Sequence, residues 1–279
     1  MNRFHRVLLV ATAALVGASA FAGGAALEPR VRGLRVLEWD LKGKAGVAAA
    51  TNYRQVRSLL MYAEPDVVVL HNARGEAKGT SKERSPLAAL AQSLGMYYAF
   101  APEVPGGDVG GGLLSRYPIR SSKPLAAEAP KGSLAGMQAE IEYMRRVTNV
   151  IMVRPENEDG SKAATAAVAK LVSGDQQGAY VILGSWGSAA DAEAAVKEWE
   201  KAGLVEAGAG LNKKTPATYP QAKPTERLEY VLVSQNLRRS VRGVEAVRHP
   251  AVKAISDRLP LEVTLARMMA ALSRERRPR

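Results

Sequence analysis

Cysteine is absent from this sequence of 279 residues. The protein therefore forms no disulfide, carries no thiol nucleophile and offers no thiolate ligand to a metal, so its stability must come from its core. Aromatic residues are also scarce, at 5% of the chain. A surface on which successive nucleic-acid bases stack needs several exposed aromatic rings, so this low content argues against such a platform.

The rest of the composition fits one α/β domain with a large core, because 47% of the residues are hydrophobic and 24% are charged. Lysine and arginine number 39 against 27 aspartates and glutamates, which gives a formal net charge of +12. This excess favours encounters with polyanions, so the expected partners are nucleic acid, an anionic lipid or a phosphate-bearing ligand. Part of the excess lies in residues 268–279, which are predicted to form a basic C-terminal tail.

The N-terminus has the pattern of a secretory signal peptide. Two arginines precede an apolar run over residues 7–22, and small residues suited to cleavage lie near its end. A permanent membrane anchor needs about 20 apolar residues. We therefore predict a cleaved signal peptide (residues 1–26), a linker (27–33) and one domain (34–267) that is exported to the periplasm or outside the cell, with no transmembrane segment after cleavage. An uncleaved anchor is the alternative, and it would leave the same domain outside the membrane.

Hydrophobic patterning predicts strands and helices that interleave along the chain. Residues 34–39 alternate apolar and polar side chains, as a half-buried strand does, and residues 67–70 are a continuous apolar run typical of a strand buried on both faces. The segments 106–112 and 155–162 are predicted to be loops. Further strands are predicted at 113–115, 135–143, 147–153, 180–183, 228–233 and 261–265, and helices at 53–63, 86–94, 163–172 and 189–202. Adjacent strand pairs occur beside the alternating elements, which indicates mixed sheets in layers.

Six segments at predicted strand ends resemble, in order, segments of the endonuclease/exonuclease/phosphatase superfamily. Residues 113–119 are close to the family's Leu-Ser-Arg-Tyr-Pro-Ile. The others lie at residues 34–40, 65–72, 181–187, 227–232 and 256–260, where the family has Trp-Asn, Pro-Asp-(apolar)-Leu-Gln-Glu, Gly-Asp-Phe-Asn, Arg-Ile-Asp-Tyr-Ile-Leu and Ser-Asp-His-(apolar)-Pro. The resemblance spans residues 34–265.

This resemblance implies a four-layered α-β-β-α sandwich with two packed mixed sheets. It also implies hydrolysis of phosphodiester or phosphomonoester bonds with a divalent cation, commonly Mg²⁺, which carboxylates hold and which polarises the phosphoryl oxygen. An aspartate orients the attacking water in such enzymes, and histidines stabilise the developing charge or transfer protons.

Five positions that carry this chemistry in the family hold other side chains here. Asn72 replaces a metal-binding glutamate, Ser185 replaces the water-orienting aspartate, and Gly187 replaces a phosphate-binding asparagine. Ile151 occupies the position expected for a catalytic histidine, and Arg258 replaces the final histidine. An amide binds a hard cation more weakly than a carboxylate, and a guanidinium is no general acid or base at neutral pH. The resemblance therefore implies a degenerate site in which no catalytic residue is identified.

Three carboxylates remain at positions that the resemblance associates with metal. Asp40 replaces an asparagine, Glu229 replaces an aspartate, and Asp257 matches directly. They are the candidate residual ligands for Mg²⁺ or Mn²⁺, and Arg258 beside them is a candidate phosphate-binding group. His71 is interpreted as an ordinary strand-end histidine or as a compensating ligand.

The leading hypothesis is an exported pseudoenzyme that needs no cofactor, retains the fold and binds an anionic partner. The first alternative is a metal-dependent phosphodiesterase, nuclease or phosphatase in which the three carboxylates form a rebuilt metal site. The second is a non-catalytic nucleic-acid-binding module that uses only its basic surface.

Overall fold

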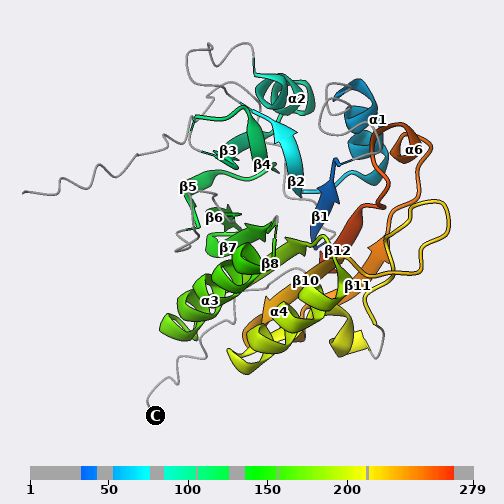
Figure 1. Cartoon of the computed structure of the whole chain (residues 1–279). Helices are drawn as coiled ribbons and strands as arrows, with labels where there is room; N and C mark the ends of the chain where they lie inside the picture. Colours follow the sequence, from blue (N-terminus) through cyan, green and yellow to red (C-terminus); the bar gives the residue numbers. More distant parts are fainter. Residues whose placement is uncertain are drawn as a thin grey trace, which may run out of the picture.

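The computed structural model describes residues 33–42, 53–75, 85–104, 106–125, 136–155, 157–211 and 214–266. Two six-stranded sheets make up the centre of this part of the chain (Figure 1). The predicted signal peptide, the linker up to residue 32 and the basic tail lie outside the described residues. None of the described helices is long and apolar enough to cross a membrane.

The first sheet is mixed, because β1 runs parallel to β2 while its other neighbouring strands are antiparallel. Its spatial order is β11 (Val241–Ala246), β12 (Leu261–Leu265), β1 (Leu34–Asp40), β2 (Val67–Arg74), β4 (Val109–Ser115) and β3 (Tyr97–Pro102).

The second sheet is mixed in the same way, with β7 parallel to β8 and the other neighbours antiparallel. Its spatial order is β5 (Ile119–Pro124), β6 (Gly136–Tyr143), β7 (Arg146–Val153), β8 (Tyr180–Ser185), β10 (Glu229–Ser234) and β9 (Leu204–Glu206).

Three hydrophobic cores separate four layers. One core joins the facing sides of the two sheets, the second lies between the first sheet and its helices, and the third lies between the second sheet and its helices. The helices of the first sheet are α1 (Tyr53–Ala63), α2 (Pro86–Leu94) and α6 (Val252–Ile255), and those of the second are α3 (Glu158–Gly174) and α4 (Ala189–Lys201). The short helices η4 (Ala207–Leu211) and α5 (Gln235–Arg238) follow β9 and β10. The predicted four-layered α-β-β-α sandwich with two mixed sheets is confirmed.

Successive side chains of β1 point alternately into two of these cores. Val36 packs in the core between the sheets, whereas Leu37 and Trp39 pack against the helices. Successive side chains of a strand point to opposite faces, so Glu38 and Asp40 continue the row of Val36 and face the second sheet. Two carboxylates are thereby placed between the sheets at the end of a central strand.

Two predicted loops are partly regular structure. Helix α3 begins at Glu158, inside the segment 155–162, because the side chain of Asn157 accepts a hydrogen bond of 2.8 Å from the backbone nitrogen of Gly160 and caps the helix. Strand β4 begins at Val109, inside the glycine-rich segment. A Cβ at Gly110 would lie 2.1 Å from the carbonyl oxygen of Ala101 on β3, so this glycine is needed for close strand pairing.

Candidate functional site

The two sheets bring polar side chains together at one end of the space between them. Strand β1 ends at Asp40, beside His71 of the parallel strand β2. In the second sheet β8 ends at Ser185, which lies opposite Glu229 at the start of β10. Ser185 and Glu229 extend the rows of inward-facing residues on their strands, so the carboxylates of both sheets meet across the interface.

Asp40 is fully buried and accepts hydrogen bonds at both carboxylate oxygens. Its Oδ1 accepts from Asn72 Nδ2 at 2.5 Å and from the backbone nitrogen of Lys42 at 2.8 Å. Its Oδ2 lies 2.9 Å from Ser185 Oγ and accepts from Arg154 Nε at 3.2 Å. Neither oxygen is left without a protein partner.

Glu229 is equally buried, and the guanidinium of Arg258 lies against it. Arg258 Nη1 lies 2.7 Å from Glu229 Oε1, 3.0 Å from Ser185 Oγ and 3.7 Å from Asp40 Oδ2. Ser185 Oγ is 3.2 Å from the same Glu229 oxygen, and Thr218 Oγ1 donates to the other one. One guanidinium therefore lies between the two carboxylates that the strands bring together.

The charges of the buried carboxylates in this cluster are balanced by side chains of the protein itself. Burial acts to raise the pKa of Asp40, but Arg154 and Arg258 outweigh it and hold that pKa well below its usual range. Burial raises the pKa of Glu229, although Arg258 and the hydroxyl of Thr218 act in the opposite direction. The pKa of Arg258 is raised by Glu229 and Asp40 against the effect of burial. Two guanidinium groups thus balance two buried carboxylates.

A divalent cation does not fit this donor set. The oxygens of Asp40 and Glu229 are already occupied by donors of the protein, and a dication among them would be repelled by Arg154 and Arg258. Asp257, the third predicted ligand, has its Oδ1 3.9 Å from Arg258 Nε. Among the residues that the structure describes, no three His, Asp or Glu side chains form a group that could hold a metal ion.

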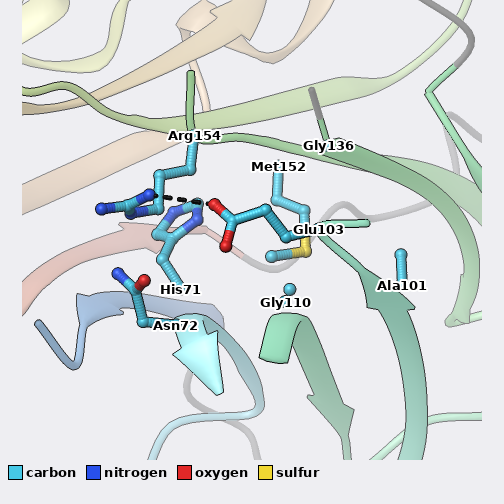
Figure 2. Close-up of a pocket in the computed structure, with 9 residues that line it drawn as sticks. His71, Asn72, Ala101, Glu103, Gly110, Gly136, Met152 and Arg154 are labelled. Atoms are coloured by element: carbon cyan, nitrogen blue, oxygen red, sulfur yellow. Dashed lines mark hydrogen bonds and ion pairs between the residues drawn. The ribbon is translucent and has the colours of Figure 1, made fainter. Parts of the chain in front are cut away.

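Arg154 closes the open side of the cluster. Its Nη1 donates to Glu103 Oε1 at 3.2 Å while its Nε donates to Asp40, so it connects strand β7 to the strands β3 and β1 of the other sheet. Figure 2 shows Arg154 and Glu103 joined above His71 and Asn72, in a pocket of about 30 Å³. This volume admits a couple of water molecules at most. Since Asp40, Ser185 and Glu229 are 0% exposed and Arg258 is 7% exposed, a phosphate group cannot reach the cluster without rearrangement.

A second buried pair lies beside the cluster. His71 Nε2 lies 2.7 Å from Glu38 Oε1, and both side chains are shielded from solvent. Burial lowers the pKa of His71 to about 3, and burial together with the charges of Glu229 and Asp40 raises the pKa of Glu38 well above its ordinary value. In the folded protein at neutral pH the histidine is therefore neutral, and the shift in the pKa of Glu38 favours the protonated form of that carboxyl.

The His71–Glu38 pair predicts a pH dependence of the free energy of unfolding, which becomes measurable when Glu38 is replaced. The lowered pKa of His71 stabilises the fold above pH 6.5, and that contribution is lost as pH falls towards 3, because the unfolded chain then binds the proton that the folded chain refuses. The raised pKa of Glu38 contributes in the opposite sense, so the two effects offset each other. In the Glu38→Gln variant the offset is gone, and the free energy of unfolding should fall by about 2 kcal/mol between about pH 7 and about pH 5 because of His71, whereas the wild type should lose less. Urea unfolding at the two pH values measures this difference, and an equal pH response in both proteins would contradict the assignment.

Asp257 lies beside the buried cluster, with its Oδ1 3.9 Å from Arg258 Nε. The other predicted site residues divide into two groups. Asp40, Asn72, Ser185, Glu229 and Arg258 are brought together in the buried cluster.

Ile151 and Gly187 lie elsewhere. The side chain of Ile151 packs in the core beneath α3 and α4, on the outer face of β7, while Met152 faces inward, so the structure does not place Ile151 at a catalytic position. Gly187 is exposed beyond the end of β8, with open space around it.

Sequence reasoning missed Glu38, Arg154 and Thr218. A signal existed for Glu38, because it stands two residues before Asp40 in an alternating strand and so shares its face. Arg154 directly follows β7 and Asp40 ends β1, which places a charged residue at the same end of each sheet. Thr218 lies in an irregular segment, where no sequence pattern indicated that it contacts the site.

Comparison with solved structures identifies proteins of the same fold. An endonuclease/exonuclease/phosphatase family protein from Leptotrichia buccalis has 13% sequence identity and a TM-score of 0.65, with 83% of this chain and 99% of that chain covered. A 3′ phosphatase from Neisseria, solved with a product DNA hairpin, has 16% identity and a TM-score of 0.61 at the same coverage. An AP endonuclease from Archaeoglobus fulgidus has 14% identity and a TM-score of 0.62, again at that coverage. Identities this low establish the fold alone.

Comparison with curated proteins finds no match, whereas comparison with known families does. The sequence profile described as the C-terminal nuclease-like domain of PGAP2IP matches residues 39–212, which is more than half of the chain and includes Asp40, Asn72 and Ser185. The chain therefore belongs to this family of nuclease-like domains, within the endonuclease/exonuclease/phosphatase superfamily.

Proposed function

We propose that the protein is an exported, catalytically degenerate member of this family, which has kept the fold and acts by binding an anionic partner. The observation that carries the proposal is the position of Arg258, whose guanidinium lies between the buried carboxylates of Glu229 and Asp40. A cation of the protein thus supplies the charge compensation that a divalent metal ion supplies in the metal-dependent hydrolases of this fold.

The remaining groups of the cluster support the same proposal. Ser185 and Asn72 donate hydrogen bonds to Asp40, so they act as structural partners of a carboxylate instead of groups that orient water or hold metal. The histidine nearest the cluster, His71, is buried, neutral at physiological pH and bonded to Glu38. The side chains of Asp40, Ser185 and Glu229 are fully buried, so none of them is exposed to a substrate for proton transfer.

The binding half of the proposal is supported by charge. The chain carries a net charge of +12, which attracts polyanions before any specific contact forms. The similar 3′ phosphatase from Neisseria was solved with a DNA hairpin, which keeps nucleic acid among the candidate partners together with anionic lipid and phosphate-bearing ligands. Export rests on the predicted signal peptide.

Thermal unfolding with and without divalent ions tests the proposal. A functional site with a dissociation constant near 0.1 mM would gain about 2.7 kcal/mol from about 10 mM Mg²⁺ or Mn²⁺, which corresponds to a rise of roughly 5–10 °C in the unfolding midpoint. We expect a shift below about 1 °C relative to a control with NaCl at equal ionic strength. A rise of the larger size that disappears in the Asp40→Asn variant would instead support the rebuilt metal site of Asp40, Glu229 and Asp257.

A further inference from the structure

Large apolar side chains are exposed at few places in the described part of the chain. Only Met61, Tyr62 and Val104 fall in this class, with exposed fractions of 53%, 67% and 53%. Met61 and Tyr62 are adjacent in the last turn of α1, whereas Val104 lies in the segment after β3. An exposed pair of apolar side chains at one helix end is a feature that folding alone does not require.

Tyr62 is held in place at the surface. Its ring centroid lies 5.2 Å from that of His249, and the His249 ring is fixed in turn because its Nδ1 accepts a hydrogen bond of 3.1 Å from the backbone nitrogen of Ala251. This contact joins the end of α1 to the segment that leads into α6, and the two helices lie side by side over the first sheet (Figure 1). The exposed ring is therefore an ordered part of the surface.

Four exposed cations belong to the same two helices and their flanks. Arg54 and Arg57 lie on the solvent face of α1 and share that face with Met61. Arg248 precedes His249, and Lys253 lies in α6, four residues after His249. None of the four makes an ion pair within the described ranges, in contrast to exposed cations such as Lys162 and Lys201 of the opposite helical layer, which pair with glutamates.

We propose that the α1/α6 patch, formed by Met61, Tyr62, Arg54, Arg57, Arg248 and Lys253, docks on an anionic lipid bilayer. Tyrosine is favoured at the level of the lipid headgroups, and a thioether side chain beside it can enter the acyl boundary. The unpaired cations around them are attracted by the negative surface potential of anionic lipids. This combination of an apolar pair with surrounding cations is the chemistry by which peripheral proteins bind membranes.

A nucleic-acid strand fits the same patch less well. Strands without sequence preference bind where successive bases stack on a row of aromatic rings, and the patch presents one tyrosine, one face of which is already against His249. Met61 adds apolar surface that offers no stacking partner. The patch therefore favours a lipid surface over a single strand.

This inference rests on the binding half of the proposed function and specifies the partner and the surface. It is independent of the buried cluster, because the patch lies on the helices outside the first sheet while the cluster lies between the sheets. An experiment can consequently contradict the proposal of catalytic inactivity without contradicting lipid binding, and the reverse.

Co-sedimentation of the protein with vesicles tests the inference. Vesicles of phosphatidylcholine alone are compared with vesicles that also contain phosphatidylglycerol, in buffer of low ionic strength. We expect binding to the anionic vesicles only. The double variant Met61→Ser/Tyr62→Ser should bind at least about tenfold more weakly, and Lys253→Gln or Arg248→Gln should each reduce binding about fivefold.

Val104→Ser is the matched control, because Val104 has the same 53% exposure as Met61 but lies outside the patch, and this variant should bind like the wild type. Unchanged thermal unfolding of each surface variant shows that its fold is intact. Equal binding by the double variant, or equal binding to neutral vesicles, would overturn the inference. The inference would also be overturned if the wild type bound single-stranded DNA but no vesicles, and the double variant lost the DNA binding. That result would still support an anionic partner. Metal-dependent hydrolysis, by contrast, would overturn only the catalytic half of the proposed function.

Discussion

The Arg258→Met variant should be less stable than the wild type by about 3–5 kcal/mol in free energy of unfolding. Methionine keeps most of the length and apolar contacts of the side chain but leaves the buried carboxylate of Glu229 without its guanidinium partner, which lies 2.7 Å away in the wild type. The backbone oxygen of Trp186 loses a donor at the same time. Urea unfolding at neutral pH, followed by circular dichroism, measures the difference.

A double-mutant cycle separates the loss of charge compensation from the loss of packing. If buried charge is the cause, adding Glu229→Gln to Arg258→Met should recover more than about 1 kcal/mol, because the unpaired carboxylate is then removed. Arg239→Met serves as the control, since Arg239 is exposed, and it should change stability by no more than about 0.5 kcal/mol. An Arg258→Met variant as stable as this control would contradict the account of the cluster.

Most of the fold was predictable because its strands carry strong local patterns. The run that forms β2 is buried on both faces, as a continuous apolar segment indicates, and helix α1 matches its apolar spacing from Tyr53–Ala63. Strands β3, β5, β9 and β11 were not predicted, and all four lie at sheet edges; in β5 and β11 the residues are partly exposed and the polar ones do not alternate clearly with apolar ones. Edge strands leave weaker sequence patterns than central ones.

The members of the site were largely predictable, whereas their interactions were not. Strand-end segments pointed to Asp40, Ser185, Glu229 and Arg258, and the structure brings these four together. Arg258 was expected to offer its guanidinium to a phosphate, but that group is bound to carboxylates of the protein instead. Contacts between residues tens to hundreds of positions apart depend on how the sheets pack, and no local pattern records that packing.

Ile151 shows where residue matching along a strand fails. A displacement of one position moves a side chain to the other face of a sheet. Ile151 packs on the outer face of β7, and its neighbours Val150 and Met152 are the residues that face the space between the sheets. The segment around it had no motif that fixed the register.

The largest effect that we predict is a loss of hydrolytic activity relative to an enzyme that carries the superfamily's catalytic groups. Removing one group that stabilises the transition state typically costs about 2–4 kcal/mol, or roughly two to three powers of ten in rate. Asn72, Ser185 and Arg258 all differ from the groups that the superfamily resemblance associates with catalysis, and each is bonded within the buried cluster. Non-additivity reduces the combined loss, but several powers of ten remain.

The most direct test is hydrolysis of a generic phosphodiester by the protein with Mg²⁺ or Mn²⁺, measured beside its Asp257→Ala variant. Asp257 is the carboxylate that matches the superfamily pattern directly, and its side chain is 32% exposed and lies at the edge of the buried cluster, 3.9 Å from Arg258 Nε. We expect both proteins to show only the rate of the buffer with metal. A metal-dependent rate that Asp257→Ala abolishes would contradict this expectation and identify the protein as an active hydrolase with a rebuilt centre.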